Sequence, residues 1–302
     1  MSDQNRKAFR LIFLFGLVSL LAIWGCQVKE VDVSKLELRK VHVDDIDIAY
    51  KTFGIGEPLV LIMGFSGTMD MWQPHVLAEL SSHYKVIVFD SRGIGESSAT
   101  EKEFSIELFA DDVAGLMNAL GIKKANVLGW SMGTNVAQEL VLRHPEKVNK
   151  LILYAADAGG KESIQPEEPL KMIMDTSGRL QDREARVAKV LFPEEWRKKH
   201  PNLREYFPFP KERSIVENIN RQAKAMLQWQ GSYSRLGQIK CPVLLITGTE
   251  DVIPPPINST MMGEKISGAK VVQIKGGGHG VMYQYPDDFS KLILEFLKGK
   301  NG

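Results

Sequence analysis

The sequence is poor in cysteine and shows no pattern of metal ligands. Two cysteines, Cys26 and Cys241, lie far apart in 302 residues, which does not predict a disulfide framework. No pair among the six histidines has the spacing of zinc ligands. We therefore expect neither a metal site nor a fold that depends on disulfides.

An excess of charge of one sign is also missing. The formal net charge is +1, from 38 basic and 37 acidic side chains, which gives no electrostatic reason to expect a nucleic-acid partner. The segment closest to a dinucleotide-binding motif, Gly93-Ile94-Gly95, lacks the third glycine. We find no internal repeat or low-complexity tract. With 44% hydrophobic residues, one large α/β domain without a cofactor is the simplest interpretation.

The most informative segment that is present is Gly129-Trp130-Ser131-Met132-Gly133, which reads G-x-S-x-G. The short run 125–128 before it is fit for a buried parallel strand, and apolar residues at helical spacing follow it up to Pro145. A serine between a strand and a helix lies on a sharp turn, where flanking side chains would collide with nearby backbone. The turn exposes the hydroxyl and directs the helix N-terminus at charge that develops during acyl transfer. Ser131 is therefore the candidate nucleophile.

Two downstream loops offer the groups that such a serine needs. A serine hydroxyl requires a base, and the base requires a carboxylate that orients it. The apolar strand 243–246 leads into a loop with Asp251, and the strand 271–274 leads into a glycine-rich loop with His279. Both loops follow the carboxyl ends of strands, so we expect them at the same edge of the sheet as Ser131. The other histidines have no such setting: His42, His75, His83, His144 and His200.

The identity of the acid is open between three residues. Asp251 is preferred because it lies in a loop just past the carboxyl end of a strand and fits the chain order serine, acid, histidine. Glu250 is adjacent to it, and Asp157 follows the apolar run 151–156. Loop geometry decides between them, and the sequence alone does not specify it.

Together these motifs resemble those of the α/β-hydrolase superfamily, in particular its esterase, enol-lactonase and cofactor-free haloperoxidase-like branch. The resemblance also rests on Met63-Gly64-Phe65 and on the segment 90–97, and it covers roughly residues 35 to 298. It implies Ser131 as nucleophile, His279 as general base and then acid, and Asp251 as the residue that orients the histidine. It also implies an oxyanion hole made by the backbone N–H groups of Phe65 and Met132.

Two segments of this resemblance need separate comment. Members of the superfamily often carry His-Gly where this chain has Met63-Gly64, so the support of the oxyanion loop differs here. Asp90 and Arg92 are interpreted as residues that fix their turn through hydrogen bonds and a charge pair, not as catalytic groups.

The N-terminal segment has a different character. Three basic residues precede an apolar run that ends at Trp24, an order typical of an export signal. Ile23-Trp24-Gly25-Cys26 resembles the lipobox of prokaryotic lipoproteins, in which the cysteine is lipidated. An uncleaved signal anchor is the alternative, because the uncharged run is just long enough to span a bilayer. Both interpretations predict an extracytoplasmic protein, anchored to the membrane at the cell envelope of a prokaryote.

The expected organisation divides the chain into a signal segment (1–26), a linker (27–35), an α/β-hydrolase core (36–160 and 236–302) and a helical cap (161–235). Residues 36–43 and 46–50 are expected to open a mostly parallel central sheet as an antiparallel pair of strands. The cap has helical tendency, and the chain is expected to leave and re-enter the sheet at the edge that carries Ser131. Six prolines interrupt it: Pro166, Pro169, Pro193, Pro201, Pro208 and Pro210.

These features predict a serine hydrolase that cleaves carboxylic esters of small to medium, largely apolar substrates through an acyl-enzyme. Apolar cap residues favour an apolar pocket, although most of them are expected to join the cap to the core. Lactone hydrolysis, C–C bond hydrolysis, aminopeptidase action and perhydrolysis need the same triad and remain alternatives. A more distant alternative is a non-catalytic binding protein of the envelope, which is disfavoured because every triad position holds a competent residue.

Overall fold

The structure is a computed structural model of the chain, and it describes residues 30–208 and 214–299. Its centre is an eight-stranded sheet in the order β1-β2-β4-β3-β5-β6-β7-β8. β1 and β2 are antiparallel to each other, β2 is antiparallel to β4, and the remaining pairs are parallel. The strands are β1 Arg39–Val43, β2 Ile46–Phe53, β3 Pro58–Ile62, β4 Lys85–Phe89, β5 Ala125–Trp130, β6 Val148–Tyr154, β7 Val243–Gly248 and β8 Lys270–Ile274.

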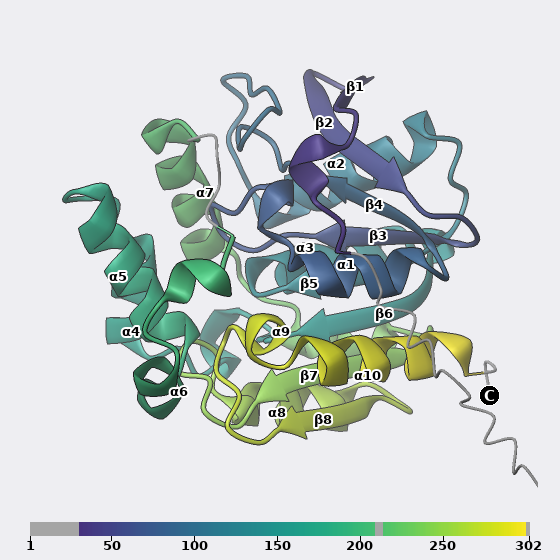
Figure 1. Cartoon of the computed structure of the whole chain (residues 1–302). Coiled ribbons are helices and arrows are strands. Elements are labelled where there is room, and N and C mark those ends of the chain that lie inside the picture. The colour runs from purple at the N-terminus through teal and green to yellow at the C-terminus, as the bar shows by residue number, and fades with distance from the viewer. Residues whose placement is uncertain (1–29, 209–213, 300–302) are drawn as a thin grey trace, which may run out of the picture.

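Helices cover both faces of this sheet (Figure 1). Helices α1 and α10 pack together on one face, and α2, α3 and α8 lie on the other. The elements are α1 Pro74–Ser81, α2 Ile106–Ala119, α3 Met132–Arg143, α8 Pro256–Lys265, α9 Val281–Gln284 and α10 Pro286–Lys298. This is the α/β architecture, with a mostly parallel sheet, that the alternation of strands and helices predicts.

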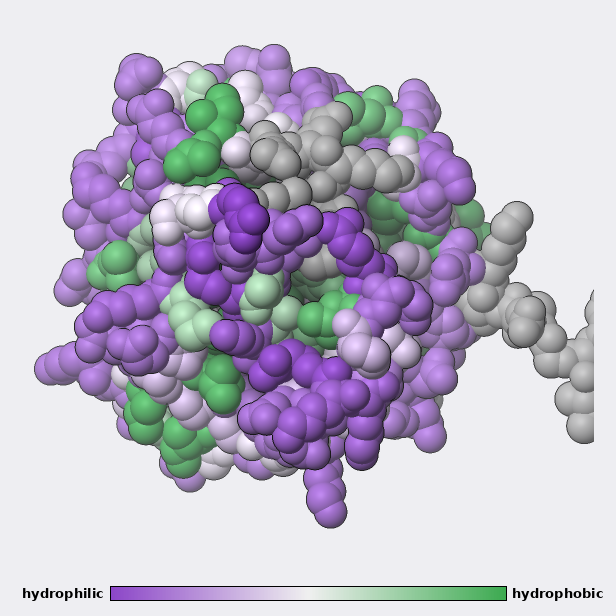
Figure 2. All heavy atoms as spheres, turned by 60° about the vertical axis from the view of Figure 1, so that its left-hand side comes forward, coloured by the Kyte–Doolittle hydropathy of each residue, from purple (hydrophilic) through white to green (hydrophobic). Residues whose placement is uncertain are grey.

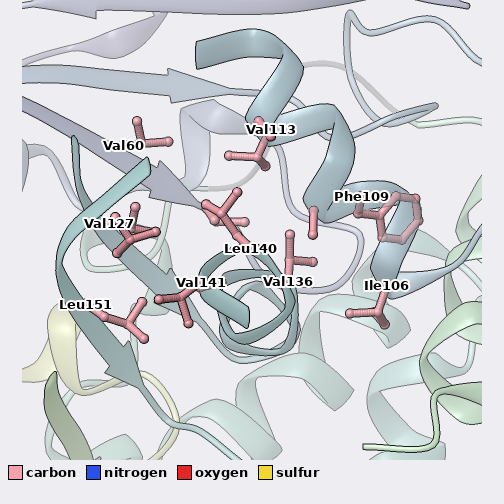
Figure 3. Packing of buried hydrophobic residues seen from close by; sticks show 14 of the residues in the cluster. Val60, Ile106, Phe109, Val113, Val127, Val136, Leu140, Val141 and Leu151 are labelled. Atoms are coloured by element: carbon pink, nitrogen blue, oxygen red, sulfur yellow. The ribbon is translucent and has the colours of Figure 1, made fainter. Parts of the chain in front are cut away.

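The core forms because the central strands are mostly apolar and buried. Both faces of a parallel sheet are covered by helices, so both faces of each strand must be apolar. In Figure 3, side chains of α2 and α3 pack against strands β3, β5 and β6. The labelled residues are Val60, Ile106, Phe109, Val113, Val127, Val136, Leu140, Val141 and Leu151. This packing fixes the end of β5, where the candidate nucleophile lies.

In the described residues between β6 and β7, four α-helices lie outside these layers, and we refer to them as the cap. They are α4 Glu167–Met174, α5 Leu180–Leu191, α6 Glu194–Lys199 and α7 Val216–Gln228. Figure 1 shows them beyond the carboxyl ends of the parallel strands. Figure 2 turns this side forward: hydrophilic residues cover most of it, and hydrophobic surface shows in a hollow near its centre.

The N-terminal part differs in one detail from the expected strand 36–43. The strand begins at Arg39, where pairing with β2 starts opposite Tyr50, and a short 3-10 helix at Val33–Lys35 precedes it. The Asp32 side chain accepts hydrogen bonds from the backbone N–H and the hydroxyl of Ser34, which stabilises this turn. The predicted signal segment 1–26, with Cys26, lies outside the described residues. Within residues 30–208 and 214–299, no helix is long and apolar enough to span a bilayer.

Candidate active site

The turn between β5 and α3 carries Ser131 in a strained conformation. Its φ and ψ are 54° and −125°, outside the regions that L-residues usually occupy. The flanking glycines leave no room for side chains: a Cβ on Gly129 would lie 2.4 Å from the carbonyl oxygen of Gly133, and one on Gly133 would lie 2.1 Å from that of Ile62. Close contact between strand and helix therefore forces the turn, as the sequence motif predicts. Ser131 is the N-cap of α3, so its side chain lies at the positive end of the helix dipole.

The loop after β3 lies directly against Ser131. A Cβ on Gly64 would be 3.2 Å from Cβ of Ser131 and 3.8 Å from its Oγ. Phe65 follows Gly64, and Met132, the first residue of α3, follows Ser131. Both backbone N–H groups named for the oxyanion hole therefore belong to residues adjacent to this contact. Met63 is 1% exposed, and a Cβ on Gly67 would lie 2.7 Å from its Cγ. An apolar side chain thus packs under this loop where relatives often have a histidine.

The structure brings Asp251 and His279 together in a buried pair. Nδ1 of His279 lies 2.9 Å from Oδ2 and 3.2 Å from Oδ1 of Asp251, and the two residues are 1% and 4% exposed. The backbone N–H of Ile253 donates to Oδ1 at 2.9 Å, which fixes the carboxylate. Because a carboxylate accepts hydrogen bonds, Nδ1 carries the proton and Nε2 of the neutral ring is left as a base.

Nε2 of His279 is buried and has no hydrogen-bond partner among the described residues. The Ser131 hydroxyl is therefore not hydrogen-bonded to the ring in this structure. Contacts between nucleophile and base are often loose without a substrate and tighten in the complex. The ring contacts the residue that precedes the nucleophile: its centroid lies 5.7 Å from that of Trp130.

Two aromatic residues that hold His279 were missed by the sequence analysis. The indole N–H of Trp130 and the hydroxyl of Tyr154 both donate to the backbone carbonyl of His279, at 3.2 and 2.5 Å. Both rings are buried, and they stack on each other with centroids 5.9 Å apart. The available signal was their position at the last residues of β5 and β6, at the edge of the sheet where Ser131 lies.

Neither alternative acid contacts His279 by a hydrogen bond. Glu250 is exposed. Asp157 is half-buried, and its carboxylate accepts from the backbone N–H of Gly159 at 2.7 Å and from the side chain of Gln165 at 3.2 Å. Desolvation by burial raises the pKa of Asp157 above its usual range, although these hydrogen bonds oppose the shift. The geometry favours Asp251 over both.

Asp90 and Arg92 organise the segment that follows β4. Asp90 accepts from the backbone N–H groups of Met69 and Glu96, at 2.7 and 2.9 Å. Desolvation by burial raises the pKa of Asp90 to about 6, although both hydrogen bonds lower it. Arg92 is fully buried and pairs with Asp112 through two hydrogen bonds of 2.7 and 2.8 Å. Arg92 also pairs with Asp45, between β1 and β2, at 2.7 Å. Asp90 thus fixes backbone turns, and the charge pairs of Arg92 are with Asp112 of α2 and with Asp45, not with Asp90.

The cap contacts the site at two places. The backbone carbonyl of Leu191 accepts from the N–H of Gly280 at 2.8 Å, and a Cβ on Gly280 would lie 2.7 Å from the ring of Phe192. The end of α5 therefore packs on the loop of His279. On the other side, Gln222 of α7 accepts from the backbone N–H of Ser66 at 2.7 Å, in the loop that contains Phe65.

Comparisons with known proteins agree with the fold. The family model of the alpha/beta hydrolase fold matches residues 57–286. A protein named "Putative carbamate hydrolase RutD" from Azorhizobium caulinodans is 29% identical over 265 residues, covering 84% of this chain and 96% of its own. A "Putative non-heme chloroperoxidase" from Synechocystis sp. is 29% identical, with 84% of this chain and 95% of its own covered. Among solved structures, a thermophilic esterase from Thermogutta terrifontis has a TM-score of 0.75 at 27% identity, over 88% of this chain and 100% of that one.

The predicted fold class is confirmed by these similarities together with the observed sheet. The match to the family model spans the sheet from the start of β3 to the start of α10. It includes the turn of Ser131 and the loops of Asp251 and His279. The chain belongs to the alpha/beta hydrolase family.

Proposed function

We propose that this protein is a serine hydrolase that cleaves carboxylic esters of small to medium, largely apolar substrates through an acyl-enzyme. The observation that carries the proposal is the buried His279 ring. Its Nδ1 is bound to Asp251, and its Nε2 is unpartnered among the described residues. The ring contacts Trp130, which precedes the strained Ser131. A buried base of this kind activates a hydroxyl that lies within its reach.

The proposed reaction follows from the positions of these groups. Ser131 Oγ attacks the ester carbonyl while Nε2 of His279 takes its proton, and Asp251 stabilises the imidazolium that forms. The negative charge on the carbonyl oxygen is stabilised by the backbone N–H groups of Phe65 and Met132 and by the N-terminus of α3. His279 then protonates the leaving alcohol. A water molecule, deprotonated by the same ring, hydrolyses the acyl-enzyme.

The preference for apolar substrates is supported by the surroundings of the site. Leu191, Phe192 and Trp196 of the cap are buried next to the loop of His279, and hydrophobic surface shows in the hollow in Figure 2. Apolar walls with a few fixed polar groups are typical of pockets for small molecules.

A panel of chromogenic substrates tests the proposal. We expect p-nitrophenyl esters of graded chain length to be turned over, and Ser131→Ala to lower kcat by about 10⁴-fold or more with the fold retained. The panel should include a lactone, an aminoacyl amide and an aryl carbamate, since a similar protein is named a carbamate hydrolase. Two results would contradict the proposal. One is turnover of the lactone, the amide or the carbamate without turnover of any ester; the other is a Ser131→Ala variant that keeps a tenth of the wild-type rate.

We also propose that the protein is exported and held at a prokaryotic envelope membrane through Cys26. The support is the order of basic residues, apolar run and Gly25-Cys26 in the sequence. Multiple acyl chains on one cysteine anchor a protein stably, whereas one chain binds only marginally. Intact-mass analysis of protein expressed in a prokaryotic host tests this: a lipidated N-terminus at Cys26 is expected. A full-length, unmodified N-terminus would leave the signal anchor as the alternative.

A further inference from the structure

Helix α7 of the cap carries a polar residue on its buried face. Ile219, Gln222 and Ala225 are three residues apart and form the face that α7 turns to the core. Gln222 is 1% exposed. A glutamine that is buried among apolar neighbours is costly unless its amide finds partners. Its partners therefore indicate what it does.

The carbonyl half of this amide has a partner in the oxyanion loop. Oε1 of Gln222 accepts from the backbone N–H of Ser66 at 2.7 Å. Ser66 has a φ of 56°, a left-handed conformation that non-glycine residues rarely adopt. The hydrogen bond holds the peptide unit between Phe65 and Ser66, and the Phe65 N–H is the donor proposed for the oxyanion. Gln222 thus contributes to the orientation of that donor.

The other half of the amide has no partner in the described part of the chain. An N–H group can bond only to the oxygen of the amide, so the contact with Ser66 fixes which arm is the NH₂ group. Nε2 is buried and lacks an acceptor among the described residues. Buried donors in proteins are nearly always paired, so one that is left over next to a catalytic loop calls for an acceptor from elsewhere.

We propose that Gln222 is a positioning residue with two tasks, on the basis of the hydrolase function proposed above. Its carbonyl holds the Ser66 N–H and so directs the Phe65 donor at the oxyanion. Its NH₂ group donates to an oxygen of the substrate close to the scissile carbonyl. The favoured substrates are then esters whose acyl group bears an ether, hydroxyl or keto oxygen near the carbonyl.

The two tasks predict different kinetic effects. An oxyanion donor acts in the transition state, so its misalignment lowers kcat and leaves KM little changed. Removal of one such donor costs about 10² to 10³ in kcat, and we expect a smaller loss, roughly tenfold to hundredfold, when a donor is only misaligned. The hydrogen bond to the substrate should instead favour an oxygen-bearing acyl group, by roughly tenfold in kcat/KM.

Gln222→Met is the decisive variant, because methionine keeps the length of the side chain and loses both polar arms. Arg221→Met is the matched control. The Arg221 guanidinium also fixes α7 to the core, through the backbone carbonyls of Thr100 and Lys102 at 2.7 and 2.6 Å, but it does not contact the oxyanion loop. We expect the kcat loss with Gln222→Met alone. An equal loss with Arg221→Met would show that loosening of the cap is the cause, which would overturn the proposal.

A pair of substrates isolates the amide arm. Methoxyacetate and butyrate esters of p-nitrophenol differ by one oxygen in place of a methylene. After correction for their hydroxide-catalysed rates, the wild type should prefer the methoxyacetate, and Gln222→Met should lose that preference. A preference that is absent in the wild type, or unchanged in the variant, would overturn the substrate contact.

Hydrogen exchange of the Ser66 amide, measured by NMR, needs no turnover. The full-length wild type and Gln222→Glu, which keeps an acceptor oxygen, should protect this amide, and Gln222→Met should not. Fast exchange in the wild type would overturn the positioning role. If the protein turned over no ester while Ser66 followed this pattern, the proposed function would fail and the contact of Gln222 would stand.

Discussion

Helix α7 and the junction of α5 and α6 both contact the catalytic loops, but with different chemistry. On the α7 side the contacts are polar: Gln222 binds the Ser66 N–H, and Asn218 donates to the carbonyl of Gly93 at 3.1 Å. On the other side the contacts are mainly apolar and aromatic. Phe192 packs on Gly280, and its ring lies 4.7 Å from Trp196 and 6.2 Å from Tyr283.

This difference follows from what each loop must provide. The oxyanion loop supplies a backbone N–H donor that must point at the substrate oxygen, and hydrogen bonds to the loop keep this donor oriented. The loop of His279 supplies a ring whose orientation Asp251 already fixes, so the cap need only exclude water and hold the loop in place. Apolar burial strengthens the electrostatic interactions of the pair below it.

The largest effect is expected at the His279 ring, which lies under the junction of α5 and α6. Asp251→Asn should lower kcat by about 10³- to 10⁴-fold, because an amide favours the wrong tautomer of His279. Asp157→Asn and Glu250→Gln are controls and should each cost far less. Steady-state kinetics on one p-nitrophenyl ester compares the three, and the largest loss at Asp157 would move the acid to the end of β6.

The aromatic side should contribute more stability than the polar side. Phe192 is 2% exposed, and Phe192→Ala should lower the free energy of unfolding by about 3 to 5 kcal/mol through lost burial and a cavity. Denaturant unfolding followed by circular dichroism measures this loss. A change below about 1 kcal/mol would mean that the junction of α5 and α6 collapses onto the loop without this ring, and the contrast between the two sides would not hold.

On the α7 side, we expect Asp90 to make the free energy of unfolding depend on pH. It binds the N–H groups of Met69 and Glu96, and its pKa is raised from 3.8 to about 6. The folded protein therefore binds the proton more tightly than the unfolded chain, so this contribution to stability is fully present below pH 4 and is lost as the pH rises through about 6. The loss is about 3 kcal/mol. Denaturant unfolding between pH 4 and 7 should show this slope in the wild type but not in Asp90→Asn, and equal slopes would contradict it.

The smallest effect is expected where α7 ends. The indole N–H of Trp229 donates to the buried Glu139 at 2.9 Å, and Glu139 also pairs with Arg235. Trp229→Phe keeps an aromatic ring but removes this donor, which should cost about 1 to 3 kcal/mol of unfolding free energy. The same denaturant experiment measures it. A loss as large as that of Phe192→Ala would show that polar contacts stabilise the cap as strongly as aromatic packing does.

The sequence predicts best the features that depend on short-range patterns. The strand segment 125–128 and the glycines around Ser131 specify the nucleophile turn, because backbone contacts at these glycines exclude any Cβ. The loops of Asp251 and His279 follow from strands that share one edge. The choice of Asp251 was a preference among three acids, since its contact with His279 joins two loops 28 positions apart and depends on the conformation of both.

The contacts of the cap could not be predicted in the same way. The hydrogen bond from Ser66 to Gln222 joins residues 156 positions apart, and no local pattern specifies such a pair. A signal did exist, because Gln222 interrupts an otherwise apolar face of α7. The start of β1 at Arg39 was missed because it depends on pairing with β2, which begins opposite Tyr50.

Reaction with a fluorophosphonate probe, followed by mass spectrometry of the labelled peptide, tests the central claim most directly. Only a serine that a neighbouring base activates reacts with such a probe. We predict one adduct, on Ser131, whose formation is abolished by Ser131→Ala and strongly slowed by replacement of His279. A folded wild-type protein that stays unlabelled, or an adduct on another residue, would contradict the account.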